Sequence, residues 1–293
     1  VDAVVCGFSC QDMSVAHRQG KGLQGNKSNV YFGARQVLRW VKEVYAEVDF
    51  LFECTVFRDK HRTDWDFVCD DLCSSPTILD AAVVAPCYTK RAFWASFEML
   101  PLQHREATPQ RFLEEGRRPT WRWRDKLPTV MACGPVSWNQ KRCIETWTNE
   151  HWVQGPLRIG EVERIMNFGR DSTAGAMFEG ELLSTQQRWK CLGNAIHASV
   201  LAHCMVSLLV ARGYITRDDA RLEGQCWTTN QDGPSAQQER ARRLLQMARG
   251  DVPTQTVSPI PAIAQRPRAL PQGLAQRPLG ARSQVRLRTA QSS

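Results

Sequence analysis

The feature that most constrains the fold is a strand, a helix and a second strand that follow one another in the first 53 residues. Val1–Cys6 is an apolar, β-rich run that ends at a glycine, and Val48–Glu53 is a second such run. Between them lie a polar, glycine-rich loop over residues 16–29 and a helical segment that Ser28 can cap and that continues to about Tyr45. Because a helical crossover joins parallel strands, the pattern predicts an α/β protein with a parallel sheet. The helix is expected to bury one apolar face, made of Val30, Ala34, Val37, Leu38, Val41 and Val44.

Later segments continue this pattern less regularly. Ile78–Ala85 predicts another strand, and Glu161–Phe168 and Gln187–Leu209 have helical periodicity. Residues 101–152 instead indicate loops with charged and tryptophan-rich segments. A last candidate helix, Gln237–Ala248, precedes a Pro/Gln/Arg/Ala tail that we expect to be disordered, because its low apolar content cannot offset chain entropy.

Charge and cysteine content limit the class of protein. The chain has 293 residues and a formal net charge of +8, which suits a polyanionic partner. Residues 251–293 carry six arginines and one acid, so this tail supplies +5 of that charge. Eleven cysteines with one close pair, Cys69 and Cys73, favour a reducing compartment and no metal site. The most apolar stretch, Ala195–Ala211, contains His and Ser, which indicates a helix and no membrane span.

Cys10 is the first chemical candidate, because it directly follows the first strand in the segment GFSCQDMS. The carboxyl ends of parallel strands are where α/β proteins place reactive groups, although a lone cysteine is often only an apolar filler. The second strand ends in Glu53, and a carboxylate there needs a partner or a task unless it lies at the surface. Cys10 and Glu53 therefore form a candidate pair of nucleophile and acid.

Residues 20–25 read GKGLQG and match the G-x-G-x-x-G fingerprint of dinucleotide-binding proteins. That fingerprint needs a strand immediately before it, whereas residues 16–19 are polar. We therefore interpret residues 18–28 as a flexible loop beside Cys10 that can close over a bound substrate.

Seven short segments now add up to a resemblance. The segments GFSCQDMS (7–14), GLQGNKSNVYF (22–32), FLFECTVF (50–57) and APCYTKRAFW (85–94) resemble motifs IV, V, VI and VIII of the DNA (cytosine-5) methyltransferases, with spacing closest to the animal de novo branch. Similarly, LPTVMACG (127–134), EVERIMNF (161–168) and RWKCLGNA (188–195) resemble motif IX, the segment before motif X, and motif X. Each segment alone is weak, but their ordered series over residues 1–211 is specific.

The resemblance implies a Rossmann-like, S-adenosylmethionine-dependent methyltransferase with a partial parallel sheet. It implies that Cys10 adds to C6 of a flipped-out cytosine and that Glu53 protonates N3 of the same ring. Arg91 matches the second Arg of the family's R-x-R motif and would hold the base or the geometry of attack. From the residues alone, Glu53 could equally be a surface acid and Arg91 a solvated charge.

The resemblance also implies S-adenosyl-L-methionine as the cofactor, with Ser9, Asn194 and Ala195 at its site. Asn194 can equally cap the apolar helix that follows it. Motifs I to III, which hold the family's glycine-rich turn and ribose-binding acid, would lie before Val1, so we expect upstream sequence. Ser9, Cys54 and Thr89 stand where the family has Pro, Asn and Arg, and these departures put the supporting hydrogen bonds in doubt.

We expect four parts in the chain: a catalytic α/β core (1–100), a small irregular target recognition region that includes motif IX (101–160), a motif X helix that returns to the core (161–214), and a polar linker with a disordered basic tail (215–293). The recognition region can offer phosphate contacts and aromatic surfaces to DNA through Arg117, Arg118, Trp121, Arg122, Trp123 and Arg124. Residue types alone equally allow a solvated run of charges with the tryptophans folded into a core. By analogy the protein is nuclear and takes part in epigenetic DNA methylation, with a partner methyltransferase in a homo- or hetero-oligomer left open.

Three other functions stay open. The departures from the family pattern favour a catalytically inactive methyltransferase-like protein that binds nucleic acid or a partner methyltransferase. A second alternative is an RNA cytosine-5 methyltransferase of related fold. The third is an unrelated cysteine hydrolase, which needs a base near Cys10, and His17 is the close candidate in sequence.

Overall fold

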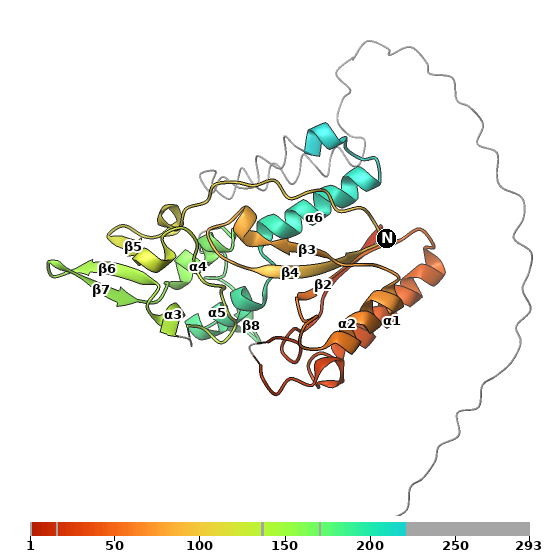
Figure 1. Cartoon of the computed structure of the whole chain (residues 1–293), viewed down its shortest axis with the longest axis horizontal. Coiled ribbons are helices and arrows are strands. Elements are labelled where there is room, and N and C mark those ends of the chain that lie inside the picture. Colours follow the sequence, from red (N-terminus) through yellow and green to blue (C-terminus); the bar gives the residue numbers. More distant parts are fainter. Residues whose placement is uncertain (1, 16, 136–137, 170, 221–293) are drawn as a thin grey trace, which may run out of the picture. The chain divides into compact units, whose positions relative to one another are not determined.

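The computed structural model describes residues 2–15, 17–135, 138–169 and 171–220, and Figure 1 shows how their elements are arranged. The main sheet has four strands in the order β1-β2-β4-β3. β1 and β2 are parallel and are joined through a helix, whereas β4 is antiparallel to both β2 and β3. The predicted α/β class with a partly parallel sheet is therefore confirmed. The strands are β1 Ala3–Gly7, β2 Asp49–Thr55, β3 Thr77–Asp80 and β4 Lys90–Ala95.

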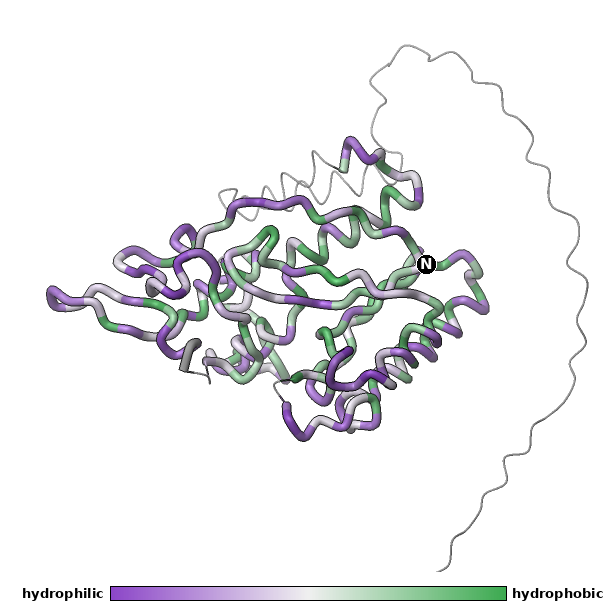
Figure 2. Tube along the Cα trace, viewed as in Figure 1, coloured by the Kyte–Doolittle hydropathy of each residue, from purple (hydrophilic) through white to green (hydrophobic). Residues whose placement is uncertain are grey.

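Helices cover both faces of this sheet. α1 (Val30–Val44) and α2 (Arg62–Leu72) share a buried cluster with Phe52 and its same-face neighbours. α6 (Ala198–Ala211) packs against the other face, where Leu51 belongs to its cluster. Because successive strand residues point to opposite faces, β2 supplies side chains to both clusters. Figure 2 shows hydrophobic stretches along the central strands and α6, and a hydrophilic connection after β4.

The predicted buried face of α1 is wrong on one side. Tyr31 and Leu38 are buried against the sheet, but Val30, Val37 and Val44 are exposed. These three valines lie seven residues apart and so form a stripe that runs beside the buried face. The apolar stripe in the sequence is wider than the surface that the sheet covers.

Ser28 does not cap α1 as predicted. Asn29 occupies the capping position, without a side-chain hydrogen bond to the helix. The Ser28 hydroxyl instead donates to the backbone oxygen of Ser9 at 2.9 Å, and Ser28 is fully buried.

The predicted strand Ile78–Ala85 is also only half correct. β3 ends at Asp80, and Ala81–Val83 forms a 3-10 turn. The Asp80 carboxylate accepts hydrogen bonds from the backbone N–H groups of Ala82 and Thr89, both at 3.0 Å. A capping side chain at this position ends the strand, although the apolar run in the sequence continues.

Residues 117–155 contain a second, three-stranded antiparallel sheet in the order β5-β6-β7. The prediction of loops throughout residues 101–152 is therefore wrong. The strands β6 and β7 form a hairpin whose turn residues, Asn149 and Glu150, both have positive φ, as two-residue hairpin turns require. The strands are β5 Arg117–Pro119, β6 Ile144–Thr148 and β7 His151–Gly155.

The remaining helices hold this second sheet against the first. α4 (Ile159–Ile165) lies within the predicted helix Glu161–Phe168, apart from its two first residues. The predicted helix Gln187–Leu209 is two helices, α5 (Thr185–Asn194) and α6, with a break at residues 195–197. Taken together, Thr185–Ala211 is long and apolar enough to cross a membrane by length and composition alone. In the structure, however, α6 packs on the main sheet with Val200 and Cys204 buried. The smaller elements are α3 Trp138–Lys141, β8 Met177–Phe178 and β9 Glu181–Leu182.

The candidate helix Gln237–Ala248 and the tail beyond it lie outside the described residues.

Candidate functional site

Cys10 lies in a turn directly after β1, at the end of the parallel pair of strands. The backbone oxygen of Cys10 accepts hydrogen bonds from the N–H groups of Met13 at 3.1 Å and Ser14 at 2.8 Å. The side chain is half-buried and packs against the apolar cluster under α1 and α2. The strand ends at Gly7 and a turn follows, so the Cys10 thiol lies at the carboxyl end of β1.

Glu53 and Arg91 form an ion pair at the same end of the sheet. Glu53 belongs to β2, and Arg91 lies in antiparallel β4 opposite Thr55, so the two side chains project from the same face. Arg91 Nε lies 2.9 Å from Glu53 Oε1, and the side chains are only 13% and 9% exposed. The structure thus brings together two of the three predicted catalytic residues in direct contact.

Burial dominates the electrostatics of Glu53. Removal from water raises the pKa of this carboxyl from 4.5 to about 7, and the Arg91 guanidinium opposes the rise by its charge and its hydrogen bond. A group with a pKa near 7 exchanges between acid and base at neutral pH, which is the range that suits general acid–base catalysis. Glu53 can therefore donate or accept a proton with little cost.

Cys10 is electrostatically coupled to both charges. Burial raises the pKa of the Cys10 thiol; the positive charge of Arg91 lowers it, and the negative charge of Glu53 raises it. Desolvation is the largest of these effects, so the resting thiol is protonated at neutral pH. The positive potential that a reactive thiol needs comes here from Arg91, and it is only partly effective while Glu53 is ionised.

The segment after α5 closes the same end of the sheet. A Cβ atom built on Gly7 would lie 3.1 Å from Glu53 Oε2 and 3.8 Å from the side chain of Ile196. Position 7 thus needs glycine because the carboxylate and the chain after Ala195 approach it closely. Asn194, the last residue of α5, is exposed.

α5 is itself held in place by a close contact. A Cβ on Gly193 would lie 2.3 Å from the backbone nitrogen of Ala132, so glycine lets α5 touch that segment directly. Trp189 Nε1 also donates to the backbone oxygen of Met131 at 2.9 Å. These contacts fix where Asn194 and Ala195 lie. Ser9, the other residue expected at the cofactor site, is half-buried beside Cys10, and its hydroxyl accepts from Gln11 N at 3.4 Å.

Two of the departures from the family pattern, Cys54 and Thr89, lie away from the Glu53–Arg91 pair. Cys54 follows Glu53 in β2 and therefore points to the opposite face, where it is fully buried among apolar side chains. Thr89 is buried, and its hydroxyl donates to the backbone oxygen of Tyr88 at 2.6 Å. Neither side chain takes part in the Glu53–Arg91 pair.

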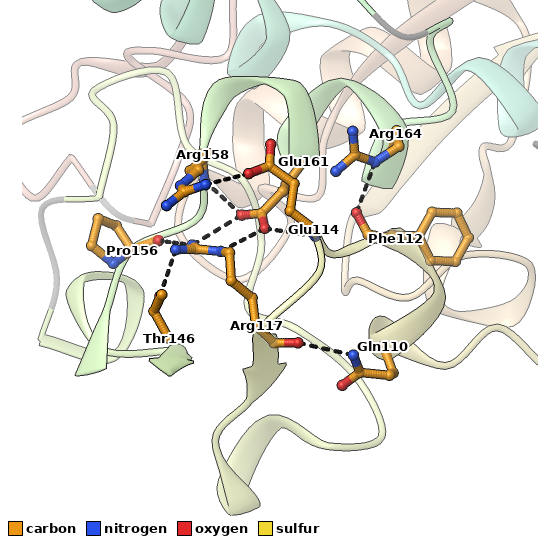
Figure 3. A network of polar contacts seen from close by, with 9 residues as sticks. All are labelled: Gln110, Phe112, Glu114, Arg117, Thr146, Pro156, Arg158, Glu161 and Arg164. Atoms are coloured by element: carbon orange, nitrogen blue, oxygen red, sulfur yellow. Dashed lines mark hydrogen bonds and ion pairs between the residues drawn. The ribbon is translucent and has the colours of Figure 1, made fainter. Parts of the chain in front are cut away.

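Arg117 does not offer a phosphate contact, contrary to the sequence prediction. Its guanidinium is buried and makes two hydrogen bonds to Glu161, from Nε at 2.7 Å and from Nη2 at 3.1 Å. Its other donors reach Thr146 Oγ1 and the backbone oxygen of Pro156, both at 2.7 Å. Figure 3 shows this network, in which one arginine ties β5 to β6 and to α4. Arg117 is therefore a structural residue of the second sheet.

The exposed side of the second sheet carries an aromatic surface that we define as Arg118, Trp147 and Trp152. Trp147 and Trp152 are cross-strand neighbours with ring centroids 5.2 Å apart and are 51% and 37% exposed. The Arg118 guanidinium lies 3.8 Å from the centre of the Trp152 ring, and its Nε pairs with Glu145 at 2.8 Å. Sequence reasoning missed both tryptophans, although the two-residue spacer Asn149–Glu150 with β-rich flanks was a hairpin signal.

The other predicted recognition residues are divided between surface and core. Trp121 is 84% exposed, and Arg124 makes an exposed pair with Asp125. Trp123 is half-buried and packs into the cluster under α4 and α5. Arg122 lies with its guanidinium 5.5 Å from the centre of the Trp123 ring.

His17 does not act as a base on Cys10 in this arrangement. Its Nδ1 lies 3.0 Å from the backbone oxygen of Gln11 and 3.8 Å from Asp12 Oδ1. These contacts orient the ring along the turn, so the cysteine hydrolase alternative loses its candidate base. Across the described residues, no group of three His, Cys, Asp or Glu side chains is arranged to hold a metal ion.

No protein-family description matches the chain, and no curated protein sequence matches it. Among solved structures, the chain is similar to the Entamoeba histolytica methyltransferase EhMeth, with 12% identity and a TM-score of 0.44 over 71% of this chain and 77% of that one. It is similar to the S. pombe Dnmt2 methyltransferase, with 14% identity and a TM-score of 0.48 over 73% and 79% of the two chains. A mutant of Spodoptera frugiperda DNMT2 gives 14% identity and 0.45 over 71% and 80%. At these values the similarity does not assign the chain to a family, and the function is argued from the site.

Proposed function

We propose that the chain is a cytosine-5 methyltransferase-type protein in which Cys10 forms a covalent adduct with C6 of a cytosine base. The observation that carries the proposal is the buried Glu53–Arg91 pair, with its 2.9 Å contact and a Glu53 pKa of about 7, whose two charges act on the thiol of Cys10. The ordered motifs of residues 1–211 support the same chemistry, and the finer assignment to the animal de novo branch rests on those motifs alone.

The three residues divide the addition step as follows. Water takes the proton of the Cys10 thiol, the resulting thiolate forms the C6–S bond, and the electrons of the C5–C6 double bond move toward N3 through the ring. Protonated Glu53 gives its proton to N3 and becomes a carboxylate, which the adjacent Arg91 stabilises. The product is an enamine in which C5 is nucleophilic, and reversal of each step restores cytosine, the thiol and the acid.

The methyl donor would be S-adenosyl-L-methionine, which supplies an electrophilic methyl group when it is bound. Ser9, Asn194 and Ala195, the residues expected at its site, do not by themselves fit this cofactor, because none carries an acid for the ribose hydroxyls. Within the described residues β1 also has a neighbouring strand on one side only. The proposal for Cys10, Glu53 and Arg91 is therefore limited to the addition step.

The proposed substrate is a cytosine flipped out of DNA in the nucleus. The aromatic surface supports a nucleic acid as the substrate. Exposed tryptophan rings can stack on bases, and a neighbouring arginine attracts phosphates. A partner methyltransferase in a homo- or hetero-oligomer is compatible with this function, and it would complete the cofactor site if it supplied the missing acid.

Exchange of the C5 hydrogen tests the addition step without a methyl donor. The enamine picks up a solvent proton at C5, so DNA with tritium at C5 of cytosine should release tritium to water. We expect release with the wild-type chain and none above background with Cys10→Ser. Cys6→Ser is the matched control, because Cys6 precedes the turn and has a raised pKa from the same burial. Equal release by wild type and Cys10→Ser would overturn the proposal.

The raised pKa of Cys10 and the loss of the family's Asn and Arg at Cys54 and Thr89 favour one alternative, a methyltransferase-like protein that binds nucleic acid without catalysis. No release from DNA or from a cytosine-labelled transfer RNA, together with retained binding to either, would support it. Release from the RNA alone would favour the RNA methyltransferase.

A further inference from the structure

The glycines of the segment GKGLQG have a structural explanation that is unrelated to nucleotide binding. A Cβ on Gly20 would lie 2.1 Å from the backbone oxygen of Asp12, and one on Gly25 would lie 2.2 Å from the Asp12 carboxylate. The backbone oxygen cannot retreat from such a contact, and a Cβ on Gly25 would also lie 2.5 Å from the Asp12 Cβ, which the backbone holds in place. Two of the three glycines are therefore needed because the loop is packed onto Asp12.

Asp12 also bonds to the far end of the same loop. Its carboxylate Oδ2 accepts hydrogen bonds from the backbone N–H groups of Lys27 at 3.0 Å and Ser28 at 3.3 Å. The backbone oxygen of Asp12 accepts a third bond from Gly22 N at 3.2 Å. The Asp12 side chain is buried, so these bonds are formed largely out of water, where an ionised acceptor binds N–H groups strongly.

The third glycine meets a second aspartate. Gly22 has a φ of +62°, and a Cβ there would lie 1.9 Å from Asp64 Oδ2 in α2. The same oxygen accepts a hydrogen bond from Leu23 N at 2.9 Å, and the Leu23 side chain is buried. Asp64 thus fixes the middle of the loop, and Asp12 fixes both of its ends.

The anchored loop bears directly on the turn that carries Cys10. Ser28, at the end of the loop, donates its hydroxyl to the backbone oxygen of Ser9, the residue before Cys10. On the other side of the thiol, Lys60 donates to the backbone oxygen of Ser14 at 2.9 Å. The backbone before Cys10 is therefore bonded to the loop that Asp12 and Asp64 hold in place, and the backbone after it is bonded to Lys60.

We infer that Asp12 and Asp64 are positioning residues that lock residues 20–28 onto the Cys10 turn and so fix the place and exposure of its thiol. In this arrangement the loop is a fixed wall of the site, and opening it requires the Asp12 bonds to break. The consequence for cytosine addition rests on the function proposed above, but the locking itself does not.

The test compares Asp12→Ala with Asp12→Asn in the full chain. Asparagine keeps an oxygen that can accept from Lys27 and Ser28, whereas alanine removes it. Asp66→Ala is the control, because Asp66 is an exposed acid of α2 that pairs with Arg62 and makes no bond to the loop among the described residues. Asp64→Ala releases the loop at Leu23 and leaves the bonds of Asp12 in place. Far-UV circular dichroism checks that each variant is folded.

Two readouts follow the loop and the thiol. Trypsin cleavage after Lys21 and Lys27 reports whether the loop opens, and the rate of iodoacetamide reaction at Cys10, measured by peptide mass as a function of pH, reports the thiol. Loss of two charge-assisted hydrogen bonds should speed both in Asp12→Ala by roughly tenfold or more. Asp12→Asn keeps the acceptor oxygen but loses the charge, so its rates should lie between those of wild type and Asp12→Ala. Asp66→Ala should stay close to wild type, and Asp64→Ala should speed cleavage after Lys21 most.

Equal rates in Asp12→Ala and Asp66→Ala would overturn the inference. So would equal effects of Asn and Ala at position 12, because these would point to the charge of Asp12 and not to its bonds. Both readouts are independent of tritium exchange. An inactive protein with a locked loop would refute only the proposed function, and an active protein with unchanged rates would refute only the locking.

Discussion

Replacement of Glu53 by glutamine should change how stability depends on pH. Burial raises the pKa of Glu53 from 4.5 to about 7, so the folded protein holds a proton that the unfolded chain has released between these values. The stabilising contribution of the acid is then complete below pH 4.5 and is lost as the pH rises through about 7. At roughly 1.4 kcal/mol for each pH unit between the two pKa values, this amounts to about 3 kcal/mol of unfolding free energy.

A second buried group hides this effect in the wild-type protein. His197 is buried, with Nε2 at 2.9 Å from the backbone oxygen of Ile165, and burial lowers its pKa from 6.5 to about 4. A histidine that stays neutral when folded loses stability as the pH falls from 6.5 to about 4, which is the opposite sign. Between about pH 4.5 and 6.5 the two contributions nearly cancel. Both Glu53→Gln and wild type contain His197, so its contribution to the unfolding free energy cancels when the two proteins are compared.

Urea unfolding followed by tryptophan fluorescence, repeated between about pH 4 and pH 8, gives the free energies. Relative to wild type, Glu53→Gln should gain about 3 kcal/mol as the pH rises from 4.5 to 7. Glu43→Gln, at an exposed position of α1, is the matched control for the substitution itself. A difference for Glu53→Gln that does not vary with pH would refute the argument, because the carboxyl would then titrate alike in both states.

Two further predictions concern the second sheet. Arg117→Ala leaves Glu161 buried without its charged partner and should lower the unfolding free energy by about 3 to 5 kcal/mol in the same urea titration. Arg118→Ala removes an exposed ion pair and should lower it by less than about 1 kcal/mol. Similar costs for both variants would contradict the internal role of Arg117. Trp147→Ala and Trp152→Ala should each weaken binding of a fluorescent single-stranded oligonucleotide by about 1 to 3 kcal/mol in an anisotropy titration, and unchanged affinity would remove the aromatic surface from the proposed function.

The first strand, α1 and the second strand could be predicted because their signals are local. Each is an apolar run or a helical repeat bounded by glycine or polar residues, so β1 and β2 were located to within two residues. β5 has only three residues and is a strand because it pairs with β6, which begins 25 residues after β5 ends. Periodicity over three residues carries no signal, and long-range pairing is not written in local sequence.

The contrast between local signals and long-range pairing also explains which functional residues could be predicted from the sequence. Glu53 stood out because a carboxylate at the end of an apolar strand is costly unless it has a partner. The role of Arg117 could not be predicted in this way, because its partner Glu161 lies 44 residues further along the chain and the two charges are buried together as a pair. Arginines are usually at surfaces, so residue type alone favoured the phosphate contact that the structure contradicts.

Arg91 connects the two titrating groups of the site in a way that favours the proposed step. Its charge lowers the pKa of both Glu53 and Cys10, but while Glu53 is ionised its own charge opposes Arg91 at the thiol. A cytosine base that enters the site displaces water. This loss of water disfavours the charged carboxylate further and so keeps Glu53 protonated. Arg91 then faces a neutral acid, and its potential acts on Cys10 without opposition. Loss of water disfavours the thiolate as well, and the unopposed charge of Arg91 counters that effect while Glu53 holds the proton that N3 needs in the proposed step.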